Sequence, residues 1–431
     1  MSNDTTASLG QPVTRRQALA RVAKTTAAAT TITGFPLVWA QNIKDVKLLQ
    51  IGGSYSNMAE IANQASKDLG FQVSMQATDD NTQINRTLTQ PNSFDINDIN
   101  VFYLEYFLGR KVLQPVPVAK YKHWEKTVPL FTKGQYPDGK RTSMQGIAPI
   151  KVQYYESREA AKFSATPTEW LTGVPSVYNA DTLGVRQDLV GRKIEQWKDL
   201  LSPEFKGRAA LIDIPSVGIM DVAMALESRG DIVYGDKGNM TRAEIDKTIA
   251  IMLELKRSGH FRAFWSNFDQ SVNLMASGEV VIQSMWSPAV TVVRSRGVQC
   301  SYVPLREGYR GWGSVLAPMA HLSGLKLDAA IEYLNWYNSG WVGAFIAKSG
   351  YYSSVPSTAQ KHLSADEWGY WYEGKAAAGD IKDAFGNAVA RKGEVRDGGA
   401  FWDRMGKIAC WNSRMSEDRY LTKRWNEFVS S

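Results

Sequence analysis

The sequence predicts an α/β protein built from two lobes, and three observations lead to that fold class. After the first forty residues, short apolar runs alternate with helix-periodic segments in the order strand, helix, strand, helix, strand. That order indicates a parallel-rich sheet with helices packed on it. The same alternation resumes past the middle of the chain. Its 431 residues exceed what one ordinary core holds, and no low-complexity linker separates the two halves.

The first elements follow directly from local patterns. Residues 46–51 form a short apolar run that predicts a strand, and the glycine-containing stretch Gly52–Ser56 predicts a tight loop after it. A helix is expected next, capped by Asn57 and ended by Gly70, because the apolar residues between them recur at helical spacing. Residues 71–77 then alternate in polarity, as in a second strand.

Later elements are expected from the same two periodicities and from turn residues. Further strands are predicted over 94–99, 209–214 and 279–284. Further helices are predicted over 82–89, 197–201, 218–227, 242–257 and 328–338, and the last hundred residues look mainly helical with glycine-rich breaks. At 286–288, Ser287 is expected to cap a helix whose first turn holds Pro288.

The N-terminus has the layout of an export leader. Thr14 is followed by the pair Arg15-Arg16, then by an Ala/Thr-rich run, then by Pro36–Ala40 with small residues at its end. Paired arginines, a modest apolar region and a small-x-Ala exit predict a twin-arginine signal peptide over 1–40. Cleavage after Ala40 would start the mature chain at Gln41 and place it in the periplasm. The alternative is a disordered N-terminus with a chance arginine pair.

Composition and charge narrow the function classes. The formal charge of +7 is mild for this length, and basic residues are scattered among acids, which argues against a nucleic-acid partner. No segment after the leader is apolar for about 18 consecutive residues, as a membrane span requires. Two cysteines, Cys300 and Cys410, lie far apart in sequence and outside any CxxC motif. Either they pair in a disulfide after export or they are two free buried thiols.

Signatures of catalysis and of metal binding are mostly missing. The chain has no HExxH, GxSxG or GxGxxG motif. Two strings of the phosphate-loop type, 134–140 and 369–375, lack the Ser or Thr that must follow the lysine. The four histidines show no spacing typical of a metal site. We therefore expect no catalytic residues, no metal and no cofactor.

Features typical of binding are better represented. Ser54, Tyr55 and Ser56 lie where the first strand meets a helix N-terminus, the edge at which ligands bind in parallel α/β sheets. Backbone N–H groups and hydroxyls there favour an anionic or hydrogen-bonding group, such as a carboxylate. Asp98 and Asn100 end the third predicted strand and are expected at the same edge. The alternative is an ordinary loop that only caps its helix.

Six segments, in order along the chain, resemble family 1 extracellular solute-binding proteins, particularly the spermidine/putrescine-binding group of ABC importers. They resemble this family's "yD" strand, its "vYNkD" run, its "W.DLl.Pe.kGk" stretch, its "SGEv…W" segment, its "vPkEG" turn and its C-terminal run. Their positions are Phe94-Asp95, Val177–Asp181, Trp197–Gly207, Ala276–Trp286, Val303–Gly308 with Trp312 beyond it, and Tyr420–Phe428.

The resemblance implies a two-lobed periplasmic-binding-protein clamshell of the type 2-like class. Two hinge crossings would join the lobes, and a small-molecule solute would bind in the cleft between them. The expected lobes are 41–172 with 313–356, and 173–312 with 357–431. The implied partner is an ABC permease in the inner membrane, and the protein is expected to be a monomer without catalysis.

The resemblance also implies which residues contact the solute. Trp286 and Trp312 correspond to cleft aromatics, while Ser54–Ser56 and the strand end near Asn100 and Phe102 match positions that touch ligand. Either tryptophan could instead be a core residue.

The chain departs from the family where polyamine binders place acids. Ser314 stands where those proteins have an acid two residues after the second cleft tryptophan, and past the strand near 209–214 only Asp213 remains. Because a buried ammonium needs an opposite charge, these departures favour a carboxylate-bearing or zwitterionic solute over spermidine or putrescine. The alternatives are a polyamine-binding protein, a sensor subunit or a secreted α/β enzyme. Segment 151–172 resembles an insertion without an assigned role.

Overall fold

The computed structural model describes residues 43–431, in which an 11-stranded sheet runs through the molecule. Its main path has the order β2-β1-β3-β11-β6-β9-β7-β8, with β10 and β12 paired to β6 and β15 paired to β11. The bounds are β1 Lys47–Gly52, β2 Gln72–Ala77, β3 Ile96–Asn100, β6 Val174–Val185, β7 Ala209–Ile212, β8 Phe261–Trp265, β9 Ile282–Met285, β10 Ser301–Tyr302, β11 Tyr309–Pro318, β12 Tyr352–Ser353 and β15 Ile408–Trp411.

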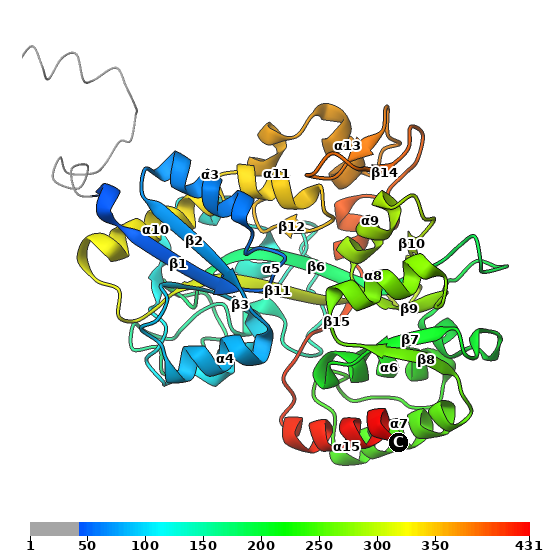
Figure 1. Ribbon diagram of the computed structural model, residues 1–431. Coiled ribbons are helices and arrows are strands. Elements are labelled where there is room, and N and C mark those ends of the chain that lie inside the picture. Colours follow the sequence, from blue (N-terminus) through cyan, green and yellow to red (C-terminus); the bar gives the residue numbers. More distant parts are fainter. Residues whose placement is uncertain (1–42) are drawn as a thin grey trace, which may run out of the picture. The chain divides into compact units, whose positions relative to one another are not determined.

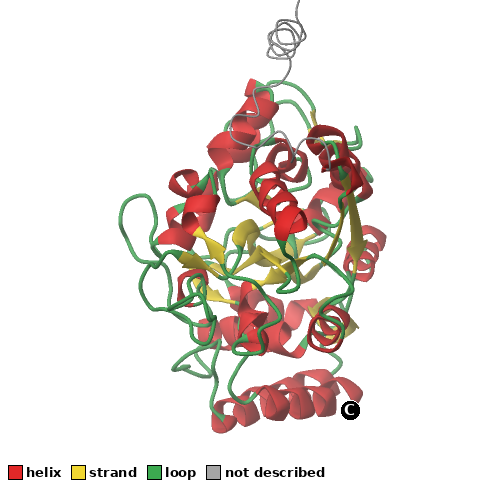
Figure 2. Cartoon of the chain, turned by 90° about the vertical axis from the view of Figure 1, so that its left-hand side faces the viewer, coloured by secondary structure: helices red, strands yellow, loops and turns green. Residues whose placement is uncertain are grey.

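Helices cover both sides of this sheet, as Figure 2 shows. The α-helices are α3 Ala59–Leu69, α4 Asp80–Thr89, α5 Pro129–Thr132, α6 Pro215–Arg229, α7 Arg242–Arg257, α8 Phe268–Ser277, α9 Ser287–Ser295, α10 Gly324–Tyr337, α11 Trp341–Ala347, α12 Pro356–Ala359, α13 Ala365–Glu373, α14 Phe401–Met405 and α15 Asp418–Ser430. Short 3-10 helices are η2 Ile43–Asp45, η3 Val101–Phe107, η4 Val118–Lys120, η5 Trp124–Lys126, η6 Pro149–Lys151, η7 Trp197–Leu201, η8 Pro203–Phe205 and η9 Gln360–His362. Among the described residues, no helix is both long and apolar enough to cross a membrane.

The N-terminal part confirms the strand-helix-strand-helix-strand prediction. β1 pairs in parallel with β2 on one side and with β3 on the other, while α3 and α4 make the connections. α3 ends at Gly70, whose φ of 75° lies in the left-handed region that glycine adopts without strain. The helix cap was predicted wrongly, because Met58 and not Asn57 precedes α3. The Asn57 side chain instead bonds to Gly53 O at 3.0 Å.

Two long antiparallel strands, β6 and β11, connect the two ends of the sheet (Figure 1). The first residues of β6 pair with β12, and its last residues pair with β9 and β10. β11 begins beside β15 and ends beside β3. Each strand therefore passes from one part of the sheet to the other, which is the arrangement that the expected two crossings require.

The second part of the sheet is parallel where β7 meets β8 and β9. α6, α7 and α15 pack together beside it, with Trp425 of α15 buried in their shared core. α7 begins and ends at the predicted residues because Thr241 and Glu244 form a capping box. α9 begins at Ser287 with Trp286 at its N-cap, so Ser287 is not the cap, although Pro288 lies in the first turn as predicted.

Residues 151–172 form an irregular segment whose end returns to a small ribbon. β5, Trp170–Leu171, pairs antiparallel with β4, Val116–Pro117. Inside the segment, the Tyr155 and Phe163 rings stack with centroids 5.7 Å apart.

A second ribbon joins β13, Ile381–Lys382, to β14, Ala388–Ala390.

Both cysteines are free and buried, so the unpaired alternative is the one that the structure adopts. Cys300 and Cys410 belong to different hydrophobic clusters. The predicted leader, including Arg15-Arg16, lies outside the described residues.

Candidate ligand-binding site

The loop after β1 folds back on itself and brings Tyr55 and Ser56 inward. Gly53 O accepts hydrogen bonds from the backbone N–H groups of Ser56 and Asn57, both at 3.2 Å. A side chain at Gly53 would collide with the Tyr55 ring, because an added Cβ would lie 2.3 Å from Tyr55 Cε1. Glycine at this position therefore lets the tyrosine ring lie against the turn.

Three aromatic rings, Tyr55, Trp312 and Tyr351, surround the inner side of this loop and are called the aromatic triad below. The Tyr55 centroid lies 5.2 Å from that of Trp312 and 5.6 Å from that of Tyr351. Trp312 and Tyr351 are 6.2 Å apart and nearly perpendicular. The rings come from the β1–α3 loop, from β11 and from the residue before β12, so three distant parts of the sequence meet here.

Asp98 is a buried carboxylate beside the triad, and hydroxyl groups surround it. Ser56 donates a short hydrogen bond to Asp98 Oδ2, and Ser176 donates to Oδ1 at 3.2 Å. Ser314 completes the group through its hydroxyl, 2.9 Å from that of Ser176. Burial raises the pKa of Asp98 to about 6, against the lowering effect of these hydrogen bonds, and also raises the pKa of Tyr55. Among the described residues, the groups acting on the Asp98 pKa are hydroxyls and not cations.

Strand register explains why Asp98 and Ser314 meet. β3 and β11 are antiparallel, with Ser314 opposite Asn100 and Leu316 opposite Asp98. Side chains two residues apart on one strand share a face of the sheet, so Asp98, Asn100 and Ser314 belong to the same local surface. The Asp98 carboxylate on β3 therefore lies near Ser314 on the adjacent strand β11.

A second polar group lies at η3 and α6. The Tyr103 hydroxyl donates to Asp80 Oδ2 at 3.0 Å, and Ser216, near the start of α6, lies close enough to Tyr103 to lower its pKa against the larger effect of burial. Burial raises the pKa of Asp80. η3 follows β3 and α6 follows β7, so this contact joins the two parts of the sheet.

The remaining predicted site residues have different surroundings. The Trp286 ring lies edge-on to Trp265 at 4.8 Å and stacks on Phe268 at 6.3 Å, and it is partly exposed. Asp213 accepts a hydrogen bond from Trp425 Nε1 at 2.8 Å, so that carboxylate holds the C-terminal helix. Ser54 is exposed, although the next residue, Tyr55, belongs to the aromatic triad.

The structure therefore gathers Tyr55, Ser56, Asp98, Trp312 and Ser314 around one point, with Asn100 in register beside them. Sequence reasoning missed Ser176, Tyr351, Asp80 and Tyr103. Ser176 directly precedes the run that resembles "vYNkD", which was a usable signal. Tyr351 follows a glycine turn without any local mark of function, so only the fold could reveal it.

The four histidines are not grouped into a metal site. Among the described residues, no cluster of three or more His, Cys, Asp or Glu side chains could hold a metal ion. Ser323 lies at the N-cap of α10, and Lys326 pairs with Asp95 at 2.7 Å.

A family model and curated relatives match parts of this chain. The family model described as bacterial extracellular solute-binding protein matches residues 58–373. The spermidine/putrescine-binding periplasmic protein of Escherichia coli (strain K12) is 29% identical over 196 residues, which are 45% of this chain and 52% of that protein. The chain thus spans about half the length of the curated relatives that it matches.

Solved structures share the fold at low sequence identity. The spermidine/putrescine ABC transporter substrate-binding protein of Streptococcus pneumoniae has a TM-score of 0.57 at 15% identity, covering 89% of this chain and 99% of its own. A periplasmic binding protein of A. tumefaciens R10, solved with agropinic acid, has a TM-score of 0.55 at 12% identity, covering 90% and 99%. The fold is the two-lobed α/β fold of periplasmic solute-binding proteins. With a family match over most of its length, the chain belongs to the bacterial extracellular solute-binding proteins.

Proposed function

We propose that this protein is the capture component of an ABC importer and binds a small zwitterionic solute between its lobes. The observation that carries the proposal is Asp98, a buried carboxylate set among serine hydroxyls beside three aromatic rings. An ammonium group would supply the missing counter-charge, and aromatic faces stabilise a cation further. Membership of the solute-binding family supports the same role.

The carboxylate of the solute is assigned to the other side of the cleft. α6 begins at Pro215 and presents its N-terminus beside Tyr103, through Ser216. The partial positive charge of a helix N-terminus favours an anion. Ser54, Ser56, Asn100 and Ser314 would orient the polar groups, while Trp286 would close the cleft from the second lobe.

A polyamine is the second candidate, and Asp80 favours it. This half-buried carboxylate lies against Tyr103 and would offer a second counter-charge for a diamine. Changing Asp80 to Asn separates the two candidates. The substitution should weaken binding of a diamine by at least tenfold, whereas binding of a zwitterion should be unchanged or tighter.

Lobes and cellular location complete the proposal. We assign residues 41–172 and 313–356 to one lobe and residues 173–312 and 357–431 to the other. The boundary after residue 172 directly precedes β6, which starts at Val174, and the boundary after residue 312 falls within β11. The third boundary, after residue 356, falls in the first turn of α12. We further propose that the twin-arginine leader is cleaved after Ala40, that the mature protein works as a periplasmic monomer, and that it delivers solute to a membrane permease without catalysis.

A thermal-shift screen of the mature chain, residues 41–431, tests the function. The panel holds amino acids, betaines, diamines, spermidine and organic acids. A specific solute at a hundredfold excess over its dissociation constant should stabilise the fold by about 2.7 kcal/mol. A hit with an amine and a carboxylate supports the proposal, and a micromolar polyamine hit favours the second candidate. Stabilisation only by acids without an amine contradicts the assignment of Asp98, and turnover of a hit favours an enzyme.

Trp286→Ala tests the contribution of the second lobe. Loss of the partly exposed ring should weaken binding of the identified solute by more than tenfold while the melting cooperativity stays intact, since Trp265 and Phe268 remain to fill the core. Isothermal titration calorimetry measures the affinity. Trp368→Ala is the matched control, because Trp368 is also half-buried and stacked, on Tyr372. An unfolded Trp286 variant would assign this ring to the core.

A further inference from the structure

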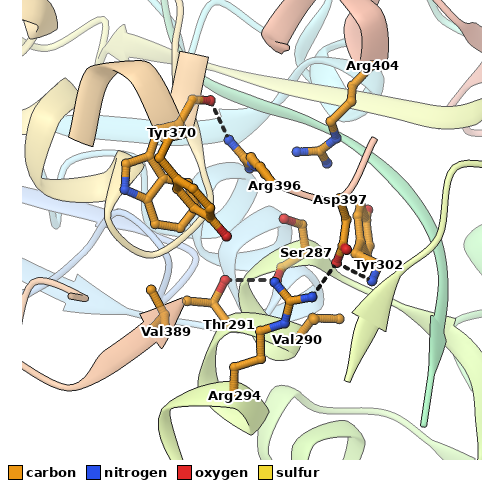
Figure 3. Close-up of a pocket in the computed structure, with 11 residues that line it drawn as sticks. Ser287, Val290, Thr291, Arg294, Tyr302, Tyr370, Val389, Arg396, Asp397 and Arg404 are labelled. Atoms are coloured by element: carbon orange, nitrogen blue, oxygen red, sulfur yellow. Dashed lines mark hydrogen bonds and ion pairs between the residues drawn. The ribbon is translucent and has the colours of Figure 1, made fainter. Parts of the chain in front are cut away.

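A small cavity lies apart from the aromatic triad, between α9, α13 and the segment after β14. It has a volume of about 20 Å³, which is room for roughly one water-sized particle. Figure 3 shows its lining, with Arg404 above, Arg294 below and Arg396 between them. Asp397 is the carboxylate that lines the same cavity.

Asp397 is already neutralised by a partner. It accepts hydrogen bonds from Arg294 Nη2 at 2.8 Å and from the backbone N–H of Tyr302 at 2.7 Å. These contacts account for one positive and one negative charge. Arg396 and Arg404 lie against aromatic faces instead: the Arg396 guanidinium is 4.6 Å from the Tyr352 ring centroid and 4.7 Å from that of Trp371, and the Arg404 guanidinium is 5.1 Å from that of Tyr302. Aromatic faces attract a cation but carry no net negative charge.

Neither remaining arginine forms an ion pair with another described residue. Arg396, 6% exposed, donates to Trp371 O at 2.8 Å and to Gly350 O at 3.3 Å. Arg404, 1% exposed, donates to the Tyr352 hydroxyl at 2.9 Å and to Ala180 O at 3.5 Å, and its Nε has no hydrogen-bond partner. Trp371 Nε1 is a second buried donor without a partner. Unpaired donors at this depth are costly and point to an absent acceptor.

The two arginines differ in their electrostatics: burial acts against the Arg404 charge, but the neighbouring tyrosines and Asp397 outweigh it and raise the Arg404 pKa. Burial, with a contribution from Arg404, lowers the pKa of Arg396. Asp181 is the next carboxylate, but it receives the Tyr302 hydroxyl at 3.1 Å and lies 3.5 Å from Arg310 Nη1. It is therefore shared with another buried cation and does not line the cavity.

We propose that this cavity binds one monatomic monovalent anion, of the halide class, between Arg396 and Arg404. Guanidinium and indole N–H groups would donate to the anion, and the hydroxyls of Ser287 and Thr291 complete the polar lining. The small volume favours a monatomic ion over a polyatomic one. A wider groove of about 430 Å³ shares Arg294 and Val389 with the cavity and offers a route from solvent.

Anomalous diffraction from crystals of the protein grown or soaked in sodium bromide tests the site directly. We expect a bromide peak within contact distance of Arg404 Nε and Arg396, at an occupancy above that of surface bromides. A peak confined to surface sites, or a water at the cavity with no anomalous signal, overturns the proposal. The wild-type protein suffices, so the result does not depend on a variant that folds.

Thermal melting supplies a second readout. Sodium chloride should raise the melting temperature by about 2 °C or more over sodium gluconate at equal ionic strength, because gluconate is too large for the cavity. Arg396→Gln should abolish this difference, and Arg391→Gln, at an exposed arginine paired with Asp380, should preserve it. Equal melting in both salts for the wild type contradicts the proposal. Solute affinity is not part of this test, so its outcome is independent of the proposed function.

Discussion

At the scale of single residues, the Asp98 carboxylate has opposite effects on the stability of the unliganded protein and on solute affinity. Its folded pKa, about 6, lies above the ordinary value of 3.8 because the carboxylate is buried. The folded state therefore binds a proton more tightly than the unfolded state does. This stabilisation is complete below pH 3.8 and is lost as pH rises through about 6. Above that pH, the unliganded protein holds an uncompensated buried charge.

Asp98→Asn is accordingly predicted to stabilise the unliganded protein and to impair binding. At pH 8, the free energy of unfolding should rise by about 1–3 kcal/mol, measured by urea denaturation. Affinity for an amine-bearing solute should fall by about tenfold or more. Wild-type affinity should also weaken as pH drops below about 6, where protonation removes the counter-charge, while the variant should lack this pH dependence.

Asp95→Asn provides the matched control. Asp95 is equally buried and precedes the same strand, but it pairs with Lys326 at 2.7 Å and accepts from Leu49 N at 2.9 Å. Its loss should destabilise the fold by about 1–2 kcal/mol and leave solute affinity intact. If both variants lowered affinity alike, Asp98 would have only a structural role.

The residue scale also shows what one sequence can and cannot predict about a site. Tyr55, Ser56, Asp98 and Trp312 could be selected because each lies next to a recognisable turn or strand end. The surroundings of Ser314 could not be predicted in this way. Serine stands there in place of the family's acid, which suggested that a negative charge was missing from the site. Cross-strand register places Asp98 beside it, and register depends on pairing between distant segments.

At the scale of elements, local capping signals were sufficient for helices but not for the long strands. α7 has its predicted bounds because the capping box acts within one turn. β6 is buried over its whole length and includes Asn179, Asp181 and Gly184, so it shows no alternation of polarity. The contacts of such polar side chains are tertiary, as when Asn179 donates to Gly350 O at 3.2 Å. Such a strand cannot be read from periodicity.

Gly218 in α6 gives a prediction at this scale. Alanine would favour the helix by about 1 kcal/mol. However, a Cβ at this position would lie 2.5 Å from both Ile212 O and the Trp425 ring. We expect Gly218→Ala to destabilise the protein by about 1–3 kcal/mol in urea denaturation, because α15 must shift. Gly191→Ala, with no atom within 4 Å of the added Cβ, should be nearly neutral. A stabilised Gly218→Ala variant would show that α15 adapts freely.

At the scale of the whole molecule, the crossing strands themselves carry part of the proposed site. Ser176 lies on β6, while Trp312 and Ser314 lie on β11. A solute held by these residues would touch the two strands that join the lobes, so binding and lobe closure would be coupled directly. A ligand shifts such an equilibrium only by its differential affinity for the closed form. Contacts between the lobes outside the site must therefore also set the apparent affinity.

Tyr106 and Arg414 make such a contact. Tyr106 follows β3 in η3, and the Arg414 guanidinium lies 4.1 Å from its ring centroid, just before α15. Asp418 accepts from Arg414 at 2.8 Å and from the Tyr106 hydroxyl at 3.3 Å. The proposed lobe boundaries place Tyr106 in the first lobe and the other two residues in the second. Under these proposed boundaries, we expect the group to favour the closed form without touching the solute.

Arg414→Met keeps the length of the side chain and removes its charge. We expect the cation–π and ion-pair contacts, together about 0.5–1 kcal/mol, to be lost from the closed form alone. Solute affinity should then fall about two- to fivefold, mainly through faster dissociation in stopped-flow tryptophan fluorescence. Small-angle scattering should give a larger radius of gyration for the unliganded variant than for the wild type. Arg419→Met, at an exposed position on α15, should change neither quantity. Unchanged dissociation and size in Arg414→Met would mean that closure depends on the solute contacts alone.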